Sequence, residues 1–153
     1  MVMLNELKNA ADLKATECKI MAQAYSSTLS ALTPANLVLV VGAALLSLVA
    51  GATILIENNL LTKVQSGVLA LISGGFTIVH SRLGCEQYQA ECKKLLCFYR
   101  GIAEEYTNLG IINDVKVIQR RLLALNDQLS ATTKHTSAMP FDWAMAKARK
   151  IFR

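Results

Sequence analysis

The stretch LVLVVGAALLSLVAGATILI, residues 37–56, decides the fold because none of its twenty residues is charged. A helix rises about 1.5 Å per residue, so this stretch is long enough to cross a hydrocarbon core of about 30 Å. The alternative is a buried helix of a soluble bundle. A helix that is apolar on every face needs protein on all sides, and a chain of 153 residues is short for that. The stretch therefore predicts a first membrane span.

A second apolar stretch, residues 64–81, predicts a second span. It is weaker because polar side chains and the pair Gly74-Gly75 interrupt it. Glycine is tolerated in membrane helices, and a polar stripe can face the partner helix. Only a short connection, which includes Glu57-Asn58-Asn59, separates the two stretches. Residues 34–81 are therefore predicted to form an antiparallel transmembrane hairpin.

Charge is distributed in blocks along the chain. Between Thr33 and Ser81 only Glu57 and Lys63 carry a formal charge, whereas 12 of the 16 Lys and Arg residues follow Ser81. The net charge of +5 fits either a nucleic-acid surface or a cytoplasmic membrane flank. No basic run is interleaved with aromatic residues, as single-strand binding requires. The flank is favoured, and direct nucleic-acid binding is not expected.

The basic residues near the span ends predict the orientation. Lys19 precedes the first span and Arg82, Lys93 and Lys94 follow the second, against Lys63 alone in the turn. Both termini are therefore expected on the cytoplasmic side of the membrane, which the family resemblance described below would make a bacterial inner membrane. The first apolar run begins only at residue 37, so no signal peptide is predicted.

Residues 1–33 predict a cytoplasmic amphipathic helix. Apolar or small residues recur there at three-four spacing, interrupted once by Lys14. The segment Thr33-Pro34-Ala35-Asn36 predicts a break, with Pro34 in the first turn of the next helix.

Residues 82–153 predict a cytoplasmic helical region with a short basic helix at its end. A long helix with a coiled-coil-like seam comes first, and Gly110 ends or kinks it. Asn113 and Asp114 can cap a second helix, residues 130–137 are expected to form a loop, and Pro140 opens the last helix. The seam comprises Cys85, Tyr88, Cys92, Leu95, Tyr99, Ile102, Tyr106 and Leu109.

The predicted fold class is an all-α membrane protein, with a two-helix hairpin and a cytoplasmic bundle of three to four helices. The last helix, with Phe141, Ile151 and Phe152 near basic residues, either lies on anionic lipid or closes the bundle. Closing the bundle is favoured.

No residue pattern predicts an enzyme. The histidines His80 and His135 lie far apart in sequence, and Glu104-Glu105 is typical of a solvated helix face. The four cysteines lack CxxC spacing and are expected to be reduced; a metal at Cys85 and Cys92 would need two further ligands. Neither a metal nor a cofactor is expected.

Small residues repeat every four positions in both spans. This pattern lets membrane helices approach closely. The two rows either face each other within one hairpin or bring at least one face to a neighbouring subunit, and both possibilities stay open. The rows are Ala43, Ser47 and Gly51 in the first span and Ser66, Ala70 and Gly74 in the second.

A polar stripe in the second span gives the candidate pore lining: Ser66, Ser73, Thr77 and His80. Polar groups at membrane depth are costly unless they are paired or wet, so such a face can line an aqueous path in an oligomer. The alternative is that the hydroxyls bond to carbonyls of their own helix.

In its order of elements the chain resembles the SLATT family of two-span bacterial effectors. The resemblance lies in YRGIAEEYTNL (residues 99–109), RRLLALNDQL (residues 120–129) and the later residues Pro140, Ala146, Ala148 and Arg149. It covers nearly the whole chain, without a catalytic motif. The resemblance implies a role in anti-phage defence, downstream of a cyclic or linear nucleotide signal or a sensor protein. It also implies a homo-oligomer that permeabilises or depolarises the membrane.

Three functions are therefore compared. The first is this oligomeric membrane effector. The second is an adaptor, in which the hairpin only anchors the chain and the seam at Tyr88, Cys92, Leu95 and Tyr99 recruits a partner. The third is a soluble all-α protein whose apolar helices are buried by oligomerisation.

Overall fold

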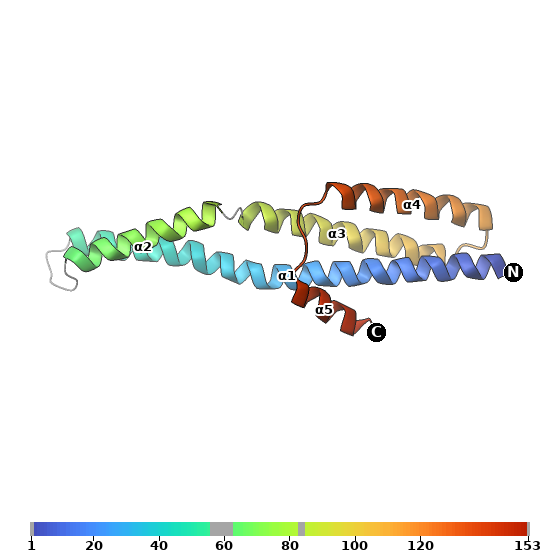
Figure 1. The fold of residues 1–153 in the computed structure, drawn as a ribbon, viewed down its shortest axis with the longest axis horizontal. Helices are drawn as coiled ribbons and strands as arrows, with labels where there is room; N and C mark the ends of the chain where they lie inside the picture. The colour runs from blue at the N-terminus through green and yellow to red at the C-terminus, as the bar shows by residue number, and fades with distance from the viewer. Residues whose placement is uncertain (1, 56–62, 83–84, 153) are drawn as a thin grey trace. The chain divides into compact units, whose positions relative to one another are not determined.

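The protein is all-helical in the part of the chain that its computed structural model describes, which is residues 2–55, 63–82 and 85–152. No strand occurs within these ranges, so the predicted all-α class is confirmed. Figure 1 shows the five helices. They are α1 (Val2–Leu55), α2 (Lys63–Arg82), α3 (Cys85–Leu109), α4 (Val115–His135) and α5 (Asp142–Ile151).

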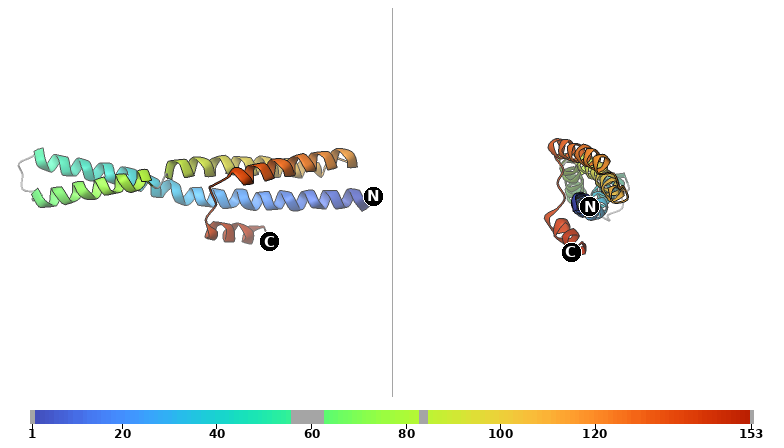
Figure 2. Two further views of the ribbon diagram at one scale, coloured as in Figure 1. Left: turned by 45° about the horizontal axis from the view of Figure 1, so that its top comes forward. Right: turned by 90° about the vertical axis from the view of Figure 1, so that its right-hand side faces the viewer.

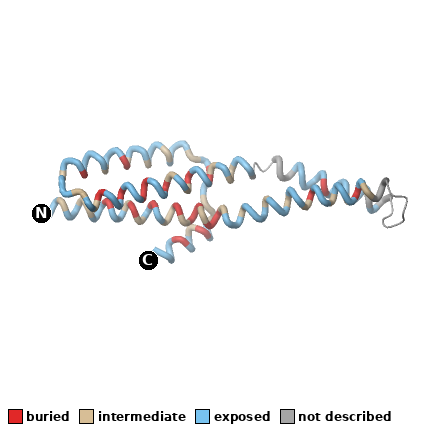
Figure 3. The backbone as a smooth tube through the Cα atoms, turned by 180° about the vertical axis from the view of Figure 1, so that it is seen from behind, coloured by how far each residue is buried: buried red, intermediate tan, exposed pale blue. Residues whose placement is uncertain are grey.

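The chain divides into two compact units. The bundle unit comprises Met1–Leu29 with Ala90–Arg153, and the apolar unit comprises Ser30–Gln89. Helix α1 contributes residues to both units. Most buried residues belong to the bundle unit (Figure 3).

In the bundle unit, the α3 helix lies beside the first half of α1, and α4 and α5 lie on opposite sides of this pair (Figures 1 and 2). The core of the pair is made of small residues from α1 and larger ones from α3. On α1, Ala11, Ala15 and Cys18 are almost fully buried. Small side chains on one helix let its neighbour approach closely, so the larger side chains of α3 fill the space between them.

Helix α1 continues through Pro34 without a break, so the predicted interruption at Thr33–Asn36 is wrong. A proline inside a helix removes one backbone hydrogen bond and costs about 3 kcal/mol, which is why the sequence suggested a break there. The cost is local, whereas the helix continues for many turns on both sides of Pro34. The continuous helix is therefore retained despite one unfavourable position.

The ends of α3 and α4 follow the sequence signals. Helix α3 ends at Leu109, immediately before Gly110, as predicted. Asp114 is the N-cap of α4, because its carboxylate accepts hydrogen bonds from the backbone nitrogens of Lys116 (2.9 Å) and Val117 (3.4 Å). These bonds satisfy donors that have no partner within the first turn of a helix.

Helix α4 extends to His135, so the loop predicted for residues 130–137 is wrong over most of its length. The hydroxyls that suggested a loop bond to their own helix. Thr133 donates to the carbonyl of Leu129, and Thr136 donates to that of Thr132 at 2.6 Å. Threonine hydroxyls that bond four residues back no longer compete with the helix for its backbone groups.

Helix α5 follows Pro140, as predicted, and Ala144 and Ala148 on one of its faces are fully buried. The segment before it is held by α1. The Tyr25 hydroxyl donates to the carbonyl of Ala138 at 2.9 Å, and the backbone nitrogen of Phe141 donates to the Thr28 hydroxyl at 3.1 Å. These contacts and the buried alanines attach α5 to the bundle. This agrees with the prediction that the last helix closes the bundle.

Candidate functional site

The outer surface of the apolar unit is the first candidate site, because large apolar side chains cover it. Twelve large hydrophobic residues are exposed there: Leu37, Val38, Val40, Val41, Leu45, Leu48, Val49, Val68, Leu71, Ile72, Phe76 and Ile78. Burying one such side chain contributes about 1.5–3 kcal/mol. Such a surface is typical of a protein face that contacts lipid or another chain.

One described helix, α1, is long and apolar enough to cross a membrane. Only 11% of its most apolar window is buried within the protein. The core helix of a soluble protein would be mostly buried, so this exposure favours contact with lipid or with other chains. Gly67–Ile78 of α2 is a shorter apolar segment.

Ser73 is the polar centre of the apolar unit. It is 2% exposed, and its hydroxyl donates to the carbonyl of Ala43 at 2.7 Å. The hydroxyls of Ser73 and Ser47 also lie within hydrogen-bond distance of each other. Ser73 therefore joins α2 to α1 through hydrogen bonds that an apolar surrounding would strengthen.

The two helices run antiparallel within this unit. Ser73 lies against Ser47 and Ala43, whereas Gln89 donates from its side-chain nitrogen to the carbonyl of Leu32 at 3.0 Å. From Ser73 to Gln89 the chain moves forward in sequence, whereas the contacted residues on α1 move backward, from Ser47 to Leu32. A cavity of about 310 Å³ lies between these contacts, with Leu39, Ala43 and Thr77 in its lining.

The predicted polar stripe is only partly described. Ser73 is buried against α1, and the exposed Thr77 donates from its hydroxyl to the carbonyl of Ser73 at 3.0 Å, within its own helix. The side chains of Ser66 and His80 lie outside the described part of the chain. In a single copy of the protein, Ser73 packs between helices, so Thr77 is the described stripe residue that remains exposed.

The two predicted rows of small residues have different environments. In the first row Ala43 is buried and Ser47 contacts Ser73, whereas Gly51 is exposed. In the second row Ala70 and Gly74 are exposed, and a Cβ atom added at Gly74 would have open space around it. The described part of the second row therefore does not face α1 within one chain.

The seam of the bundle unit is the second candidate site. Cys92, Leu95, Tyr99, Ile102 and Tyr106 are buried and Tyr88 is half-buried. The rings of Tyr99 and Tyr25 stack with centroids 5.8 Å apart, and the Tyr106 hydroxyl donates to the side-chain oxygen of Asn126 at 2.7 Å. The described seam side chains therefore pack mainly inside the bundle, which leaves little of them for a partner.

Burial also controls protonation in this core. Burial, followed by the charge of Glu17, raises the pKa of the Cys18 thiol to about 11. Burial raises the pKa of Tyr106 to about 12. Both groups are therefore neutral near pH 7, and Cys18 is a poor nucleophile there because the thiolate is the reactive form.

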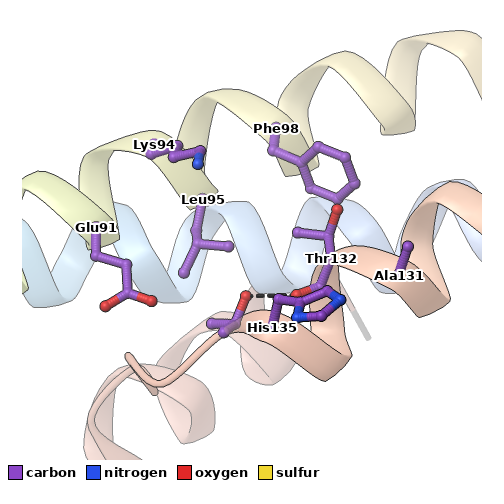
Figure 4. Close-up of a pocket in the computed structure, with 8 residues that line it drawn as sticks. Glu91, Lys94, Leu95, Phe98, Ala131, Thr132 and His135 are labelled. Carbon is purple, nitrogen blue, oxygen red and sulfur yellow. Dashed lines mark hydrogen bonds between the residues drawn. The ribbon is translucent and has the colours of Figure 1, made fainter.

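A groove of about 320 Å³ between α3 and the last turns of α4 is a third candidate site (Figure 4). Leu95 and Phe98 of α3 point toward Thr132 and His135 of α4, and Lys94 lies at the edge. The lining combines a ring, an apolar floor, basic and hydroxyl groups and the carboxylate of Glu91, and small-molecule sites likewise combine apolar and polar groups. The sequence does not predict this groove, because the polar residues 130–137 indicate a loop and not the last turns of a helix.

At the same end of the bundle, Glu91 holds the segment that follows α4. Its carboxylate accepts hydrogen bonds from the backbone nitrogen of Ser137 at 3.1 Å and from the Ser137 hydroxyl at 3.0 Å. These bonds lower the pKa of Glu91 below its ordinary value. Within residues 2–55, 63–82 and 85–152, no three His, Cys, Asp or Glu side chains are placed to hold a metal ion.

Comparison with models of protein families, with characterised proteins and with solved structures finds no match for this chain.

Proposed function

We propose that this chain is a membrane effector that oligomerises and permeabilises or depolarises the bacterial inner membrane. The observation that carries the proposal is the apolar unit, in which one buried serine joins two helices whose outer faces are apolar. A soluble protein has the opposite arrangement, with polar groups outside. With the SLATT-like order of elements, this supports a transmembrane hairpin with both termini in the cytoplasm.

Oligomerisation is proposed to use the face of α2 that carries Ala70 and Gly74. These residues are exposed in a single chain, and Gly74 leaves open space for a neighbouring backbone. Small residues drive association in membranes because they allow close packing of helices. Thr77 lies on nearly the same face, so neighbouring copies would bring their Thr77 hydroxyls toward a common axis.

Activation is proposed to begin at the groove between α3 and α4. Phe98 offers a ring for a planar group, and Lys94 and His135 offer donors for a negatively charged one. The carboxylate of Glu91 also lines the groove, but it already accepts hydrogen bonds from Ser137. These properties suit a nucleotide signal in anti-phage defence, with a sensor protein as the other possible activator. Binding there would change how the bundle units pack, and the spans would follow.

The test of permeabilisation is dye release from liposomes that hold the purified full-length chain at increasing protein density. High density substitutes for the unidentified activator by mass action. We expect release from wild-type protein and a strong loss in Gly74→Leu and Thr77→Trp. Gly75→Leu is the matched control, because Gly75 has equally open surroundings but faces about 100° away on the helix.

If wild-type liposomes leak no more than empty ones at any density, and cells expressing the chain keep their membrane potential, the pore mechanism is wrong. Recovery of the protein in the soluble fraction without detergent would favour the soluble oligomer instead.

The groove has its own test. Thermal unfolding of the full-length chain is measured with mononucleotides and cyclic dinucleotides, and we expect one of them to raise the midpoint. Phe98→Ala and Lys94→Glu should abolish that shift, whereas Lys116→Glu, an exposed change on α4 outside the groove, should not. A shift that survives in both groove variants would place the ligand elsewhere.

A membrane-anchored adaptor is the second candidate function. Replacing the spans, residues 37–56 and 64–81, with an unrelated hairpin distinguishes the two. An adaptor should keep its cellular effect, whereas a pore-forming effector should lose it.

A further inference from the structure

Helix α5 has two unlike faces. Ala144 and Ala148, four residues apart, are both fully buried against the bundle. Trp143, about 100° around the helix from Ala144, is 50% exposed. A helix that only closed a bundle would direct its largest apolar residues inward. In α5 the alanines are buried in the bundle, whereas the tryptophan is exposed.

The exposed face is also basic. Trp143, Lys147 and Lys150 are spaced by four and three residues and therefore lie on one side of the helix. Arg149 is exposed as well, and none of these three basic side chains forms an ion pair with a described acidic residue. Asp142 is the only acidic residue of the helix. The face therefore combines an aromatic ring with uncompensated positive charge.

We propose that this face of α5, formed by Trp143, Lys147 and Lys150, binds the surface of a bilayer that contains anionic lipid. Tryptophan is favoured at the headgroup level, where its ring is partly apolar and its N–H remains solvated. Lysine chains lie along apolar surface while their ammonium groups reach the phosphates. Near an anionic surface each basic residue strengthens binding about fivefold.

The alanine face makes this binding compatible with the folded bundle. An isolated amphipathic helix needs all of its apolar face to stay on a membrane. In α5 the two alanines are already buried, and the side chains of Trp143, Lys147 and Lys150 are exposed, so lipid binding requires no unfolding. The proposal goes beyond the effector function, because it gives the bundle unit a lipid contact of its own that the spans do not supply.

The experiment uses Trp143, the single tryptophan of the chain, as the probe. The full-length protein is reconstituted in vesicles of phosphatidylcholine alone and of phosphatidylcholine with phosphatidylglycerol in a two-to-one ratio. Tryptophan emission and its quenching by lipids brominated along the acyl chain are measured in each. Resistance to carbonate extraction is measured separately and reports insertion of the spans, so failure of the effector proposal and failure of this one remain distinguishable.

We expect a blue shift and strong quenching only in the anionic vesicles, and high salt should reverse both. The double variant Lys147→Glu with Lys150→Glu should weaken the anionic-lipid effect at least about 25-fold in the lipid concentration required. The matched control is Lys116→Glu with Lys134→Glu, which makes the same charge change at exposed positions of α4 and should leave the effect unchanged.

Equal quenching in both vesicle types, or quenching that survives the double variant, would overturn the proposal. A blue shift that grows with protein concentration but is insensitive to brominated lipid would also overturn it, because a second copy of the chain would then cover the face.

Discussion

The bundle unit and the apolar unit place their polar groups in opposite ways. In the bundle unit, charged residues lie outside, and buried tyrosines such as Tyr25 and Tyr106 use their hydroxyls to fix neighbouring segments. In the apolar unit, Ser73 is inside and residues such as Leu48, which is 69% exposed, lie outside. The comparison teaches that the two units have opposite surfaces, and that a substitution should have different consequences in each.

The largest expected difference concerns removal of a big apolar side chain. Tyr99→Ala removes a buried ring that stacks on Tyr25, and it should lower the free energy of unfolding of the bundle by about 3–5 kcal/mol. Leu48→Ala in the apolar unit should change it by less than about 0.5 kcal/mol, because the leucine packs against little protein. Denaturant unfolding in detergent, followed by circular dichroism, measures both. Equal losses in the two variants would contradict the comparison.

The second prediction concerns alkaline pH and applies to the bundle unit alone. The folded-state pKa of Cys18, about 11, lies above the ordinary value of 9.0. The resulting stability is therefore complete below pH 9 and is lost as the pH rises through 11, by about 2 kcal/mol. Cys18→Ala should reduce the loss between pH 9 and 11. The higher pKa of Tyr106, about 12, leaves a further loss above pH 10 in both proteins.

Denaturant unfolding at several pH values checks this prediction. Rapid labelling of Cys18 by a thiol reagent near neutral pH, at a rate close to that of the exposed Cys97, would contradict it.

The third prediction concerns the serine pair of the apolar unit. Ser73→Ala removes the donor to the Ala43 carbonyl and should weaken the contact between α1 and α2 by about 1 kcal/mol. Ser47→Ala should cost less, because the bond from Ser73 to Ala43 remains. Unfolding in mixed micelles compares the two variants. A larger loss for Ser47→Ala would mean that the pair of hydroxyls, and not the carbonyl, holds the helices.

The smallest expected effect is at Glu91. Its folded-state pKa lies below the ordinary 4.5, so its contribution to stability is present above pH 4.5 and is lost as the pH falls further. Glu91→Gln should flatten the acid side of the stability profile and leave the alkaline side unchanged. Acid unfolding of the wild type and the variant, with Glu104→Gln as an exposed control, measures the difference.

Much of the helix pattern is predictable from sequence, because strong local signals decide it. Gly110 and Asp114 set the boundary between α3 and α4, and both act within a few residues. Pro34 misleads because a single local penalty is outweighed by the helix on either side of it. The threonines near the end of α4 wrongly predict a loop. Composition does not reveal that their hydroxyls donate to carbonyls of the same helix.

The candidate sites are less predictable because they depend on which faces meet. Their spacing places Ser73 and Thr77 on one face of α2. Ser73 is nevertheless buried in the contact with α1, whereas Thr77 is exposed. Spacing also cannot show that Gly74 is open whereas Ala43 is buried. These differences depend on how the two helices are aligned against each other. The sequence of one helix alone does not determine that alignment.

The two bonds that tie α1 to the segment before α5 also constrain the order of folding. Tyr25 and Ala138 are separated by 113 residues, as are Thr28 and Phe141. At about 5–20 residues per second, a ribosome needs roughly 6–20 s to make that interval. Helices form in about a microsecond, so α1 and α2 exist long before the last part of the bundle does. The bundle therefore closes only near the end of synthesis, several seconds after the two apolar helices have been made.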